Sequence, residues 1–269
     1  MRPFNVFKRK NRILLRELVV TDFKLRYQGS ALGYMWSILK PLFLFAILYL
    51  VFDKFLSLGS AIEHFPVYLL LGIVIWNFFA EATSLGLQSI VGRGDLIRKV
   101  NFPKYIIVVS GTISSLINLG FSMIVVLLFI LINGVTLSWN MLLAIPLIIE
   151  IYIFSLGLAF FLSALNVKLR DTGYLWEIFM QAAFYATPVI YPLQMVFTKS
   201  ELAAKLLLIS PVAQVVQDIR YVLVTHDSLT IWSMLHGWRV AIPFVIIMVT
   251  VIVASIYFKK SSKQFAEEI

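Results

Sequence analysis

Ionisable side chains inside long apolar stretches are the residues of this chain that could do chemistry, because an uncompensated charge at membrane depth costs several kcal/mol. Glu150 lies near the middle of such a stretch. It is either a carboxylate that carries protons in a coupled transporter, or a neutral carboxylic acid hydrogen-bonded between helices, which we favour. Lys40 precedes Pro41 at the start of another stretch, where its stem can reach the inner headgroups. Glu81 and Glu177 lie nearer the ends of their stretches, where pairing with Lys or Arg is expected.

Several kinds of catalytic and cofactor site are absent from the sequence. No glycine stands in the G-x-x-x-x-G-K-[ST] spacing that cradles phosphate, and there is no cysteine. His64, His226 and His236 do not have the spacing of metal ligands, and position along the chain indicates no Ser/His/Asp arrangement. We therefore expect no catalytic residue, metal or cofactor in this chain. Any active transport would require a separate subunit that hydrolyses ATP.

The composition of the chain defines its broad class. Of its 269 residues, 60% are hydrophobic and 14% are charged, and the mean hydropathy is +0.90. Soluble domains are roughly half apolar and about a quarter charged, so this chain is predicted to be a polytopic membrane protein. The formal net charge of +9 is therefore interpreted against the membrane, and we expect no nucleic-acid partner.

Six apolar stretches are long enough to cross a bilayer as helices of about 20 residues. They comprise residues 31–53, 66–91, 105–133, 139–165, 174–192 and 239–258. A further apolar region, residues 202–224, is interrupted by Ser210 and Pro211 and contains charged residues. A broken helix is tolerated at membrane depth only where protein or a water-filled cavity covers its backbone groups. This region is therefore predicted to form short re-entrant helices before the last span.

The distribution of lysine and arginine favours six spans over seven. With six, both termini and the loops at 92–104 and 166–173 share one side of the membrane, which then holds 17 of the 23 basic residues. An excess of positive charge marks the cytoplasmic side. The predicted fold is an all-α polytopic membrane protein with six transmembrane helices and both termini in the cytoplasm.

The segment before the first span, residues 1–30, is basic and half apolar, which is typical of an amphipathic helix lying along the inner membrane surface. Asp22 and Arg26 fall within its apolar arc at the i, i+4 spacing that favours an ion pair, so part of this face is expected to contact protein. The alternative is a juxtamembrane helix held by anionic lipid alone. The basic residues that are candidates for receiving an anionic lipid headgroup are Arg16, Lys24, Arg26 and Lys40.

The loop after the second span, GRGDLIRKVNFPK at residues 92–104, is too patterned for a simple linker. Asp95 is expected to cap a short helix, and Pro103 to end it. This helix would project apolar and basic side chains into the cytosol, namely Leu96, Ile97, Arg98, Lys99, Val100 and Phe102. Exposed apolar side chains on such a knob indicate a protein partner, whereas the alternative is an amphipathic loop lying on the inner headgroups.

Five segments resemble, in sequence and in order, the ABC-2 type permeases, the membrane subunits of ABC transporters that export polysaccharides and teichoic acids. They are DFKLRYQGSALGYMWSILKPL, VYLLLGIVIWNFFAEATSLG, GDLIRKVNFPKY, RDTGYLWEIFMQAAFYATPVIYP and SPVAQVVQDIRYVL. The resemblance extends over residues 12–260. Within the family, residues 9–42 look most similar to permeases that export rhamnose-rich cell-wall polysaccharide.

This resemblance implies a homodimer of six-span permeases in a bacterial plasma membrane, with two copies of a separate ATPase that holds ATP and magnesium. Residues 94–103 would be the coupling helix seated in the ATPase, and residues 193–225 would form external re-entrant helices. Residues 31–260 would be the transmembrane domain, followed by a cytoplasmic tail at 261–269. The ligand would be a polysaccharide on an undecaprenyl carrier, moved from the inner to the outer leaflet.

The same resemblance places the channel between the two protomers, lined by the first and fifth spans. Both spans are rich in aromatic residues, whose faces suit the C–H faces of sugar rings. The candidate channel residues are Tyr34, Trp36, Phe43, Tyr49, Tyr174, Gln181, Phe184 and Tyr185. Tyr174, Gln181 and Tyr185 share one face of a helix. The alternative for these aromatic residues is a belt at each membrane interface together with ordinary packing.

Three other functions compete with polysaccharide export. A drug or small-lipid exporter of the same superfamily would share the topology and the ATPase. A membrane-embedded glycosyl- or acyltransferase would need a catalytic acid or histidine near one interface, and the sequence shows no convincing constellation. A stand-alone channel would have no use for an apolar cytoplasmic knob. Copurification of an ATPase would exclude the last two functions.

Overall fold

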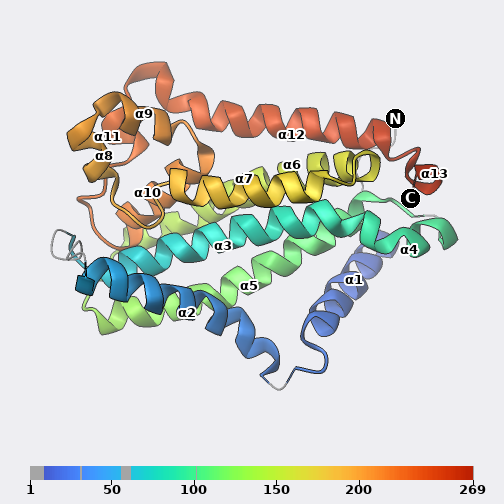
Figure 1. The fold of residues 1–269 in the computed structure, drawn as a ribbon, viewed down its shortest axis with the longest axis horizontal. Coiled ribbons are helices and arrows are strands. Elements are labelled where there is room, and N and C mark those ends of the chain that lie inside the picture. The colour runs from blue at the N-terminus through green and yellow to red at the C-terminus, as the bar shows by residue number, and fades with distance from the viewer. Residues whose placement is uncertain (1–8, 31, 56–61, 101, 269) are drawn as a thin grey trace.

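The computed structural model describes residues 9–30, 32–55, 62–100 and 102–268 (Figure 1). Within these ranges the secondary structure is helical and contains no strand, as the predicted all-α class requires. Four helices are long and apolar enough to cross a membrane. They are α3 (Phe65–Ser89), α5 (Tyr105–Ile132), α6 (Ala144–Lys168), which the 3-10 turn η5 (Trp139–Leu143) precedes, and α12 (Ile242–Ser261), which η6 (Gly237–Ala241) precedes.

These helices confirm four of the six predicted spans, but helix length does not confirm the other two. The first predicted span contains η1 (Gly33–Met35), α2 (Trp36–Tyr49) and the π-helical η2 (Leu50–Phe55). The fifth contains α7 (Thr172–Ala186), which has 15 residues. At a rise of 1.5 Å per residue, α7 extends about 22 Å, less than the ~30 Å of a hydrocarbon core.

The break predicted at Ser210 and Pro211 is present. There α9 (Glu201–Leu208) and α10 (Pro211–Leu223) meet at an angle of 99°. Proline has no backbone N–H and is suited to a first helical turn, so it begins α10 and does not continue α9. Counted as one bent span, the pair raises the number of membrane-length elements from four to five.

Helix α3 forms the centre of the bundle. It packs against α2, α5, α6, α7 and α10, and its side chains from Val67 to Ile75 are almost completely buried. Of the four membrane-length helices among the described residues, α3 is the least apolar and the most buried, because protein and not lipid covers most of its surface. Figure 1 shows α2, α5, α6 and α7 running alongside it.

Small residues allow the long helices to approach closely. Gly86 of α3 lies against Ala159 of α6, where a Cβ on the glycine would collide with the alanine side chain. Gly157 of α6 faces Val251 of α12 across a gap that leaves 3.0 Å between an added Cβ and a valine methyl. Helix pairs in membranes gain van der Waals contact in this way, so α3, α6 and α12 form one packed layer.

The shorter helices gather at the two ends of the bundle (Figure 1). At one end lie α1 (Arg9–Tyr27), η4 (Val91–Arg93), α4 (Gly94–Lys99) and α13 (Phe265–Glu268). At the other end lie α8 (Leu193–Lys199), α9, α10 and α11 (Ile231–Met234). The segment around the predicted coupling helix and the predicted external helices are therefore at opposite ends of the molecule.

A buried arginine holds the α10 end together. Arg220 of α10 has no exposed surface. Its guanidinium donates to the carbonyl oxygens of Tyr68 at 3.1 Å and Pro188 at 2.6 Å, and also to that of Val189. The same group lies over the Tyr68 ring, 3.7 Å from its centroid. These contacts join α3 and the segment after α7 to α10, and they fix the two helices that line the site described next.

Candidate functional site

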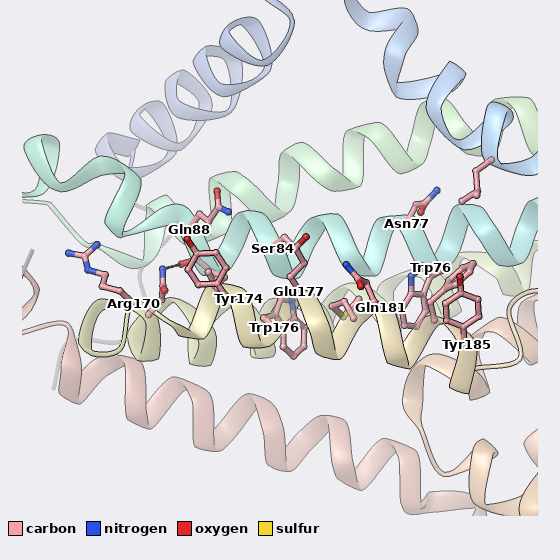
Figure 2. A pocket seen from close by; sticks show the side chains of 16 residues that line it. Trp76, Asn77, Ser84, Gln88, Arg170, Tyr174, Trp176, Glu177, Gln181 and Tyr185 are labelled. Carbon is pink, nitrogen blue, oxygen red and sulfur yellow. Dashed lines mark hydrogen bonds between the residues drawn. The ribbon is translucent and has the colours of Figure 1, made fainter.

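A groove of about 870 Å³ lies between α3 and α7 (Figure 2). Figure 2 shows that its labelled side chains come mainly from the two facing helices and mix aromatic with polar groups. From α3 come Trp76, Asn77, Ser84 and Gln88, and from α7 come Tyr174, Trp176, Glu177, Gln181, Phe184 and Tyr185. Because both hydrogen-bonding groups and aromatic faces are available, the groove suits a ligand with many hydroxyl groups and C–H surfaces.

Helix α7 contacts α3 through Trp176 and Met180, which also line the groove. The Trp176 indole Nε1 donates to Thr83 Oγ1 of α3 at 3.3 Å, and Met180, one turn further along, is buried. Tyr174 and Tyr185 are 72% and 67% exposed. The apolar side of α7 therefore anchors it to α3, while the predicted stripe of Tyr174, Gln181 and Tyr185 lines the groove together with Phe184.

The opposite wall was not predicted from the sequence. Asn77, Glu81, Ser84 and Gln88 stand at i, i+4, i+7 and i+11 on α3, so they form a polar stripe along a helix that is otherwise apolar. Three of them line the groove. Their spacing is a signal present in the sequence, although only Glu81 was expected to matter, as a residue near the end of a span.

A second cavity of about 520 Å³ lies between α2, α3 and α5, on the other side of this stripe. Trp36 and Lys40 line it, and so does Glu81, which accepts a hydrogen bond from Asn118 Nδ2 at 2.7 Å. Asn77 and Ser84 line both cavities. The two cavities are thus adjacent along α3, and of the predicted first-span residues Trp36 and Lys40 line the second one.

Two of the other first-span candidates, Phe43 and Tyr49, do not line the second cavity with Trp36. Phe43 is 59% exposed on α2. Tyr49 stacks on Phe45, with ring centroids 5.6 Å apart, and packs against the core. The side chain of Tyr34 is outside the part of the chain that the structure describes. Half of the eight predicted channel residues therefore lie on the α3–α7 groove.

Glu150 lies between α6 and α10, outside the lining of the groove. Its polar neighbours on α10 are Gln214 and Asp218, and Gln214 Nε2 donates to Asp218 Oδ2 at 2.7 Å. Among the described residues, Glu150 Oε1 is buried without a hydrogen-bond partner. The structural role of this carboxyl group therefore stays a prediction. Glu177 differs from its expected role: within the described ranges it makes no ion pair, and it faces the groove.

The predicted coupling helix is shorter than expected, and it turns different side chains outward. It spans Gly94–Lys99 and ends at Val100, and Pro103 lies just before α5. Asp95 does not cap it with a side-chain hydrogen bond; it is in the first turn, where a carboxylate suits the helix dipole.

The expected exposure of the apolar side chains is wrong for Ile97, which is 5% exposed. Phe102 packs, partly buried, against the same cluster as Ile97, which also includes Ile106 and Phe258. The residues that remain exposed around α4 are Asp95, Arg98, Lys99 and Val100, and Leu96 is half-buried. The knob therefore presents a mainly charged surface, because its bulkiest apolar groups complete the end of the bundle.

Helix α1 is joined to this knob by a polar network. The Asp22 carboxylate forms an ion pair with Arg93 of η4, and the Ser110 hydroxyl of α5 donates to Asp22 Oδ2 at 3.3 Å. Arg93 in turn donates to Ser110 Oγ at 3.1 Å. The side chain of Arg26, the predicted partner of Asp22, lies outside the described residues. The apolar arc of α1 does contact protein, since Leu14, Leu15 and Leu18 pack on the α4–α5 cluster.

The predicted headgroup-receiving residues do not form one site. Arg16 and Lys24 are exposed on α1, whereas Lys40 is exposed on α2 beside the second cavity. Arg26 again falls outside the described side chains. Among the described residues, no group of three or more His, Cys, Asp or Glu has the geometry of a metal site.

The fold and the groove define a class: a helical membrane protein with membrane-length helices and a polar, aromatic groove between its central helix and the shorter α7. More specifically, the profile of the ABC-2 type transporter family matches residues 14–224, so the chain belongs to that family. Subunits of this family are membrane components without catalytic activity, and they normally work with an ATPase partner.

Individual relatives agree with this assignment. The chain is 30% identical over 215 residues to the O-antigen export system permease protein RfbA of Myxococcus xanthus, covering 79% of this chain and 81% of the relative. It is 28% identical over 255 residues to a protein of the same name from Klebsiella pneumoniae, covering 94% of each. A second such Klebsiella pneumoniae protein is 32% identical over 184 residues, covering 68% of this chain and 70% of the relative.

Proposed function

We propose that this chain is the permease subunit of an ATP-driven exporter that moves an undecaprenyl-linked cell-surface polysaccharide from the inner to the outer leaflet of a bacterial plasma membrane. The cargo would be rhamnose-rich or teichoic acid-like. The observation that carries this proposal is the α3–α7 groove, in which aromatic and hydrogen-bonding side chains alternate in a chain of the ABC-2 family. The names of the relatives, which refer to O-antigen export, support the polysaccharide class.

The working unit would be a homodimer of this permease with two copies of a separate ATPase that binds ATP and magnesium. Each permease would have six spans and cytoplasmic termini, with α2 and α7 as the two shorter transmembrane elements. Helix α1 would lie at the inner interface and residues 193–225 at the outer side. The opposite placement of α4 and of helices α8–α11 supports this orientation.

In this arrangement each part of the chain has a separate task. The loop at 94–103 would dock on the ATPase through Asp95, Arg98, Lys99 and Val100, which are exposed. Basic residues of α1 and Lys40 of α2 would receive the anionic headgroup of the carrier lipid. The groove would then hold the sugar chain, with tyrosine rings against C–H faces and Gln181, Asn77 and Ser84 as hydrogen-bonding groups.

The test replaces the groove residues in cells that depend on this chain. In a strain that lacks the chromosomal copy, Gln181→Ala combined with Tyr185→Ala is expected to reduce surface polysaccharide about tenfold or more, since two positioning contacts are lost. Lipid-linked glycan should accumulate on the inner leaflet, protected from periodate added to spheroplasts. Trp232→Ala, an exposed aromatic residue at the α11 end, is the matched control and should leave surface polysaccharide unchanged.

Two outcomes would contradict the proposal. Unchanged surface polysaccharide in a complete deletion strain would exclude polysaccharide export. If that strain became sensitive to drugs instead, the function would be export of a drug or small lipid by the same kind of ATPase-driven permease. Export that continued unchanged in cells depleted of ATP would contradict an ATP-driven mechanism.

A further inference from the structure

The segment that follows α12 folds back onto the coupling loop. After α12 the chain turns, and α13 packs against α4 and α6. Phe265 of α13 has no exposed surface, and its ring meets that of Phe258 edge-on with centroids 5.4 Å apart. A completely buried phenylalanine in a helix of only four residues indicates that the segment is held by tertiary contacts and not by its own helicity.

A lysine joins this segment to the other end of the loop. Lys104, the residue before α5, donates from Nζ to the Ser262 carbonyl oxygen at 2.7 Å. Its ammonium group also lies 5.8 Å from the centroid of the Phe265 ring. Burial lowers the pKa of Lys104 below its usual value. The nearby Glu267 carboxylate opposes this shift without cancelling it. The lysine therefore contacts the segment through its charge, a backbone acceptor and an aromatic face.

The coupling loop is thus fixed on two sides by elements distant in the sequence. On the α1 side, Arg93 is bound by Asp22 and Ser110. On the other side, Lys104 is bound by Ser262 and lies over Phe265. Between these two points Ile97 points inward, and the charged residues of α4 point outward. Which residues the loop exposes depends on both attachments.

We infer that residues 262–268 are a positioning element for the coupling loop: Ser262 and Phe265 hold Lys104, and so keep α4 in the orientation that the ATPase binds. This inference rests on the proposed function, since it presumes that the loop docks on an ATPase. Residues 262–268 would thus orient the docking surface that α4 presents, and would not be a simple tail.

The experiment measures binding of the purified ATPase to the full-length permease in nanodiscs, together with the thermal midpoint of the permease alone. Phe265→Ala and Lys104→Met are expected to raise the apparent dissociation constant about tenfold, the usual size of a coupling between sites. Lys104→Met keeps the apolar stem of the side chain, so its thermal midpoint should stay close to that of the unmodified protein. Phe265→Ala removes a completely buried ring and is expected to lower the midpoint as well. Lys104→Arg, which keeps a donor and a cation, should restore binding.

Matched controls come from the opposite end of the molecule. Phe197→Ala and Lys199→Met on α8 make the same chemical changes at exposed positions and should leave ATPase binding unchanged. Arg98→Glu, on the exposed side of α4, tests the docking surface itself and should abolish binding.

The outcomes separate the inference from the function on which it rests. If Arg98→Glu weakens binding but Phe265→Ala and Lys104→Met do not, residues 262–268 do not position the loop and the inference is overturned. If Lys104→Arg binds as poorly as Lys104→Met, positioning through that contact is likewise overturned. If the unmodified permease does not bind the ATPase at all, the proposed function fails as well.

Discussion

At the scale of single residues, Arg220 shows how a charge is accommodated in the apolar end of this molecule. Its guanidinium has carbonyl oxygens and an aromatic face as partners, contributed by α3 and by the segment after α7. Arginine suits this position because its planar group donates in several fixed directions, which a lysine ammonium does not reproduce. The arrangement also requires Gly72, since any side chain there would occupy the space of the guanidinium.

Two glycine substitutions should therefore have opposite effects on stability. In Gly72→Ala the added Cβ would meet the Arg220 guanidinium and lie 2.8 Å from the Val189 carbonyl oxygen, so we expect destabilisation of about 1–3 kcal/mol. Gly120 of α5 has nothing within 4 Å of an added Cβ. Gly120→Ala should stabilise the protein by up to about 1 kcal/mol through helix propensity. Thermal midpoints in detergent check both, and equal midpoints would contradict the packing at Gly72.

At the scale of secondary-structure elements, the loop between α3 and α5 is built into the bundle and is not a free projection. Its anchor on the α1 side is the ion pair between Asp22 and Arg93, whose side chains are 20% and 23% exposed. A partly buried pair supported by Ser110 is screened less by solvent than a surface pair. The pair therefore links α1 to the coupling loop directly.

Reversing these charges tests the link. Asp22→Arg or Arg93→Asp alone places like charges in contact and should lower the thermal midpoint, whereas the double variant should recover most of the loss. The expected coupling energy is about 1–2 kcal/mol, typical of neighbouring residues. Arg12→Asp, an exposed position on α1, is the control and should have little effect. Additive losses in the double variant would show that the two residues do not interact.

The elements that the sequence predicted well are those set by local composition. The long apolar runs predict α3, α5, α6 and α12, and Ser210 with Pro211 predicts the break before α10. The spacing on α7 likewise predicts the stripe that the groove displays. The inward turn of Ile97 and the pairing of Asp22 with Arg93 depend on residues distant in the chain. A periodic pattern in one segment contains no information about such partners.

At the scale of the whole molecule, the question is which end faces the cytoplasm. Helices α4 and α13 lie at one end and helices α8–α11 at the other. The basic residues of the N-terminal segment and of the loop at 92–104 favour the cytoplasm for the α4 end. The chain has no cysteine, so single cysteines can report the side of each position without a background to remove.

A membrane-impermeant maleimide should label Asn140→Cys and Lys199→Cys in intact cells. The variants Lys99→Cys and Glu268→Cys should be labelled only after the membrane is permeabilised. All four positions are exposed, so accessibility within the fold does not limit the reaction. Labelling of Glu268→Cys in intact cells would contradict the proposed six spans, because it would place residues 261–269 outside.

The continuity of α3 with the coupling loop has a mechanical consequence. The helix spans 25 residues, about 37 Å, and passes through Ile90 and η4 directly into α4. Its tight contact with α6 is at Gly86, three residues from its end. Trp76, which lines the groove, is about 15 Å further along the same helix. A displacement of α4 would therefore reach the groove through continuous helical backbone, without a flexible loop between them.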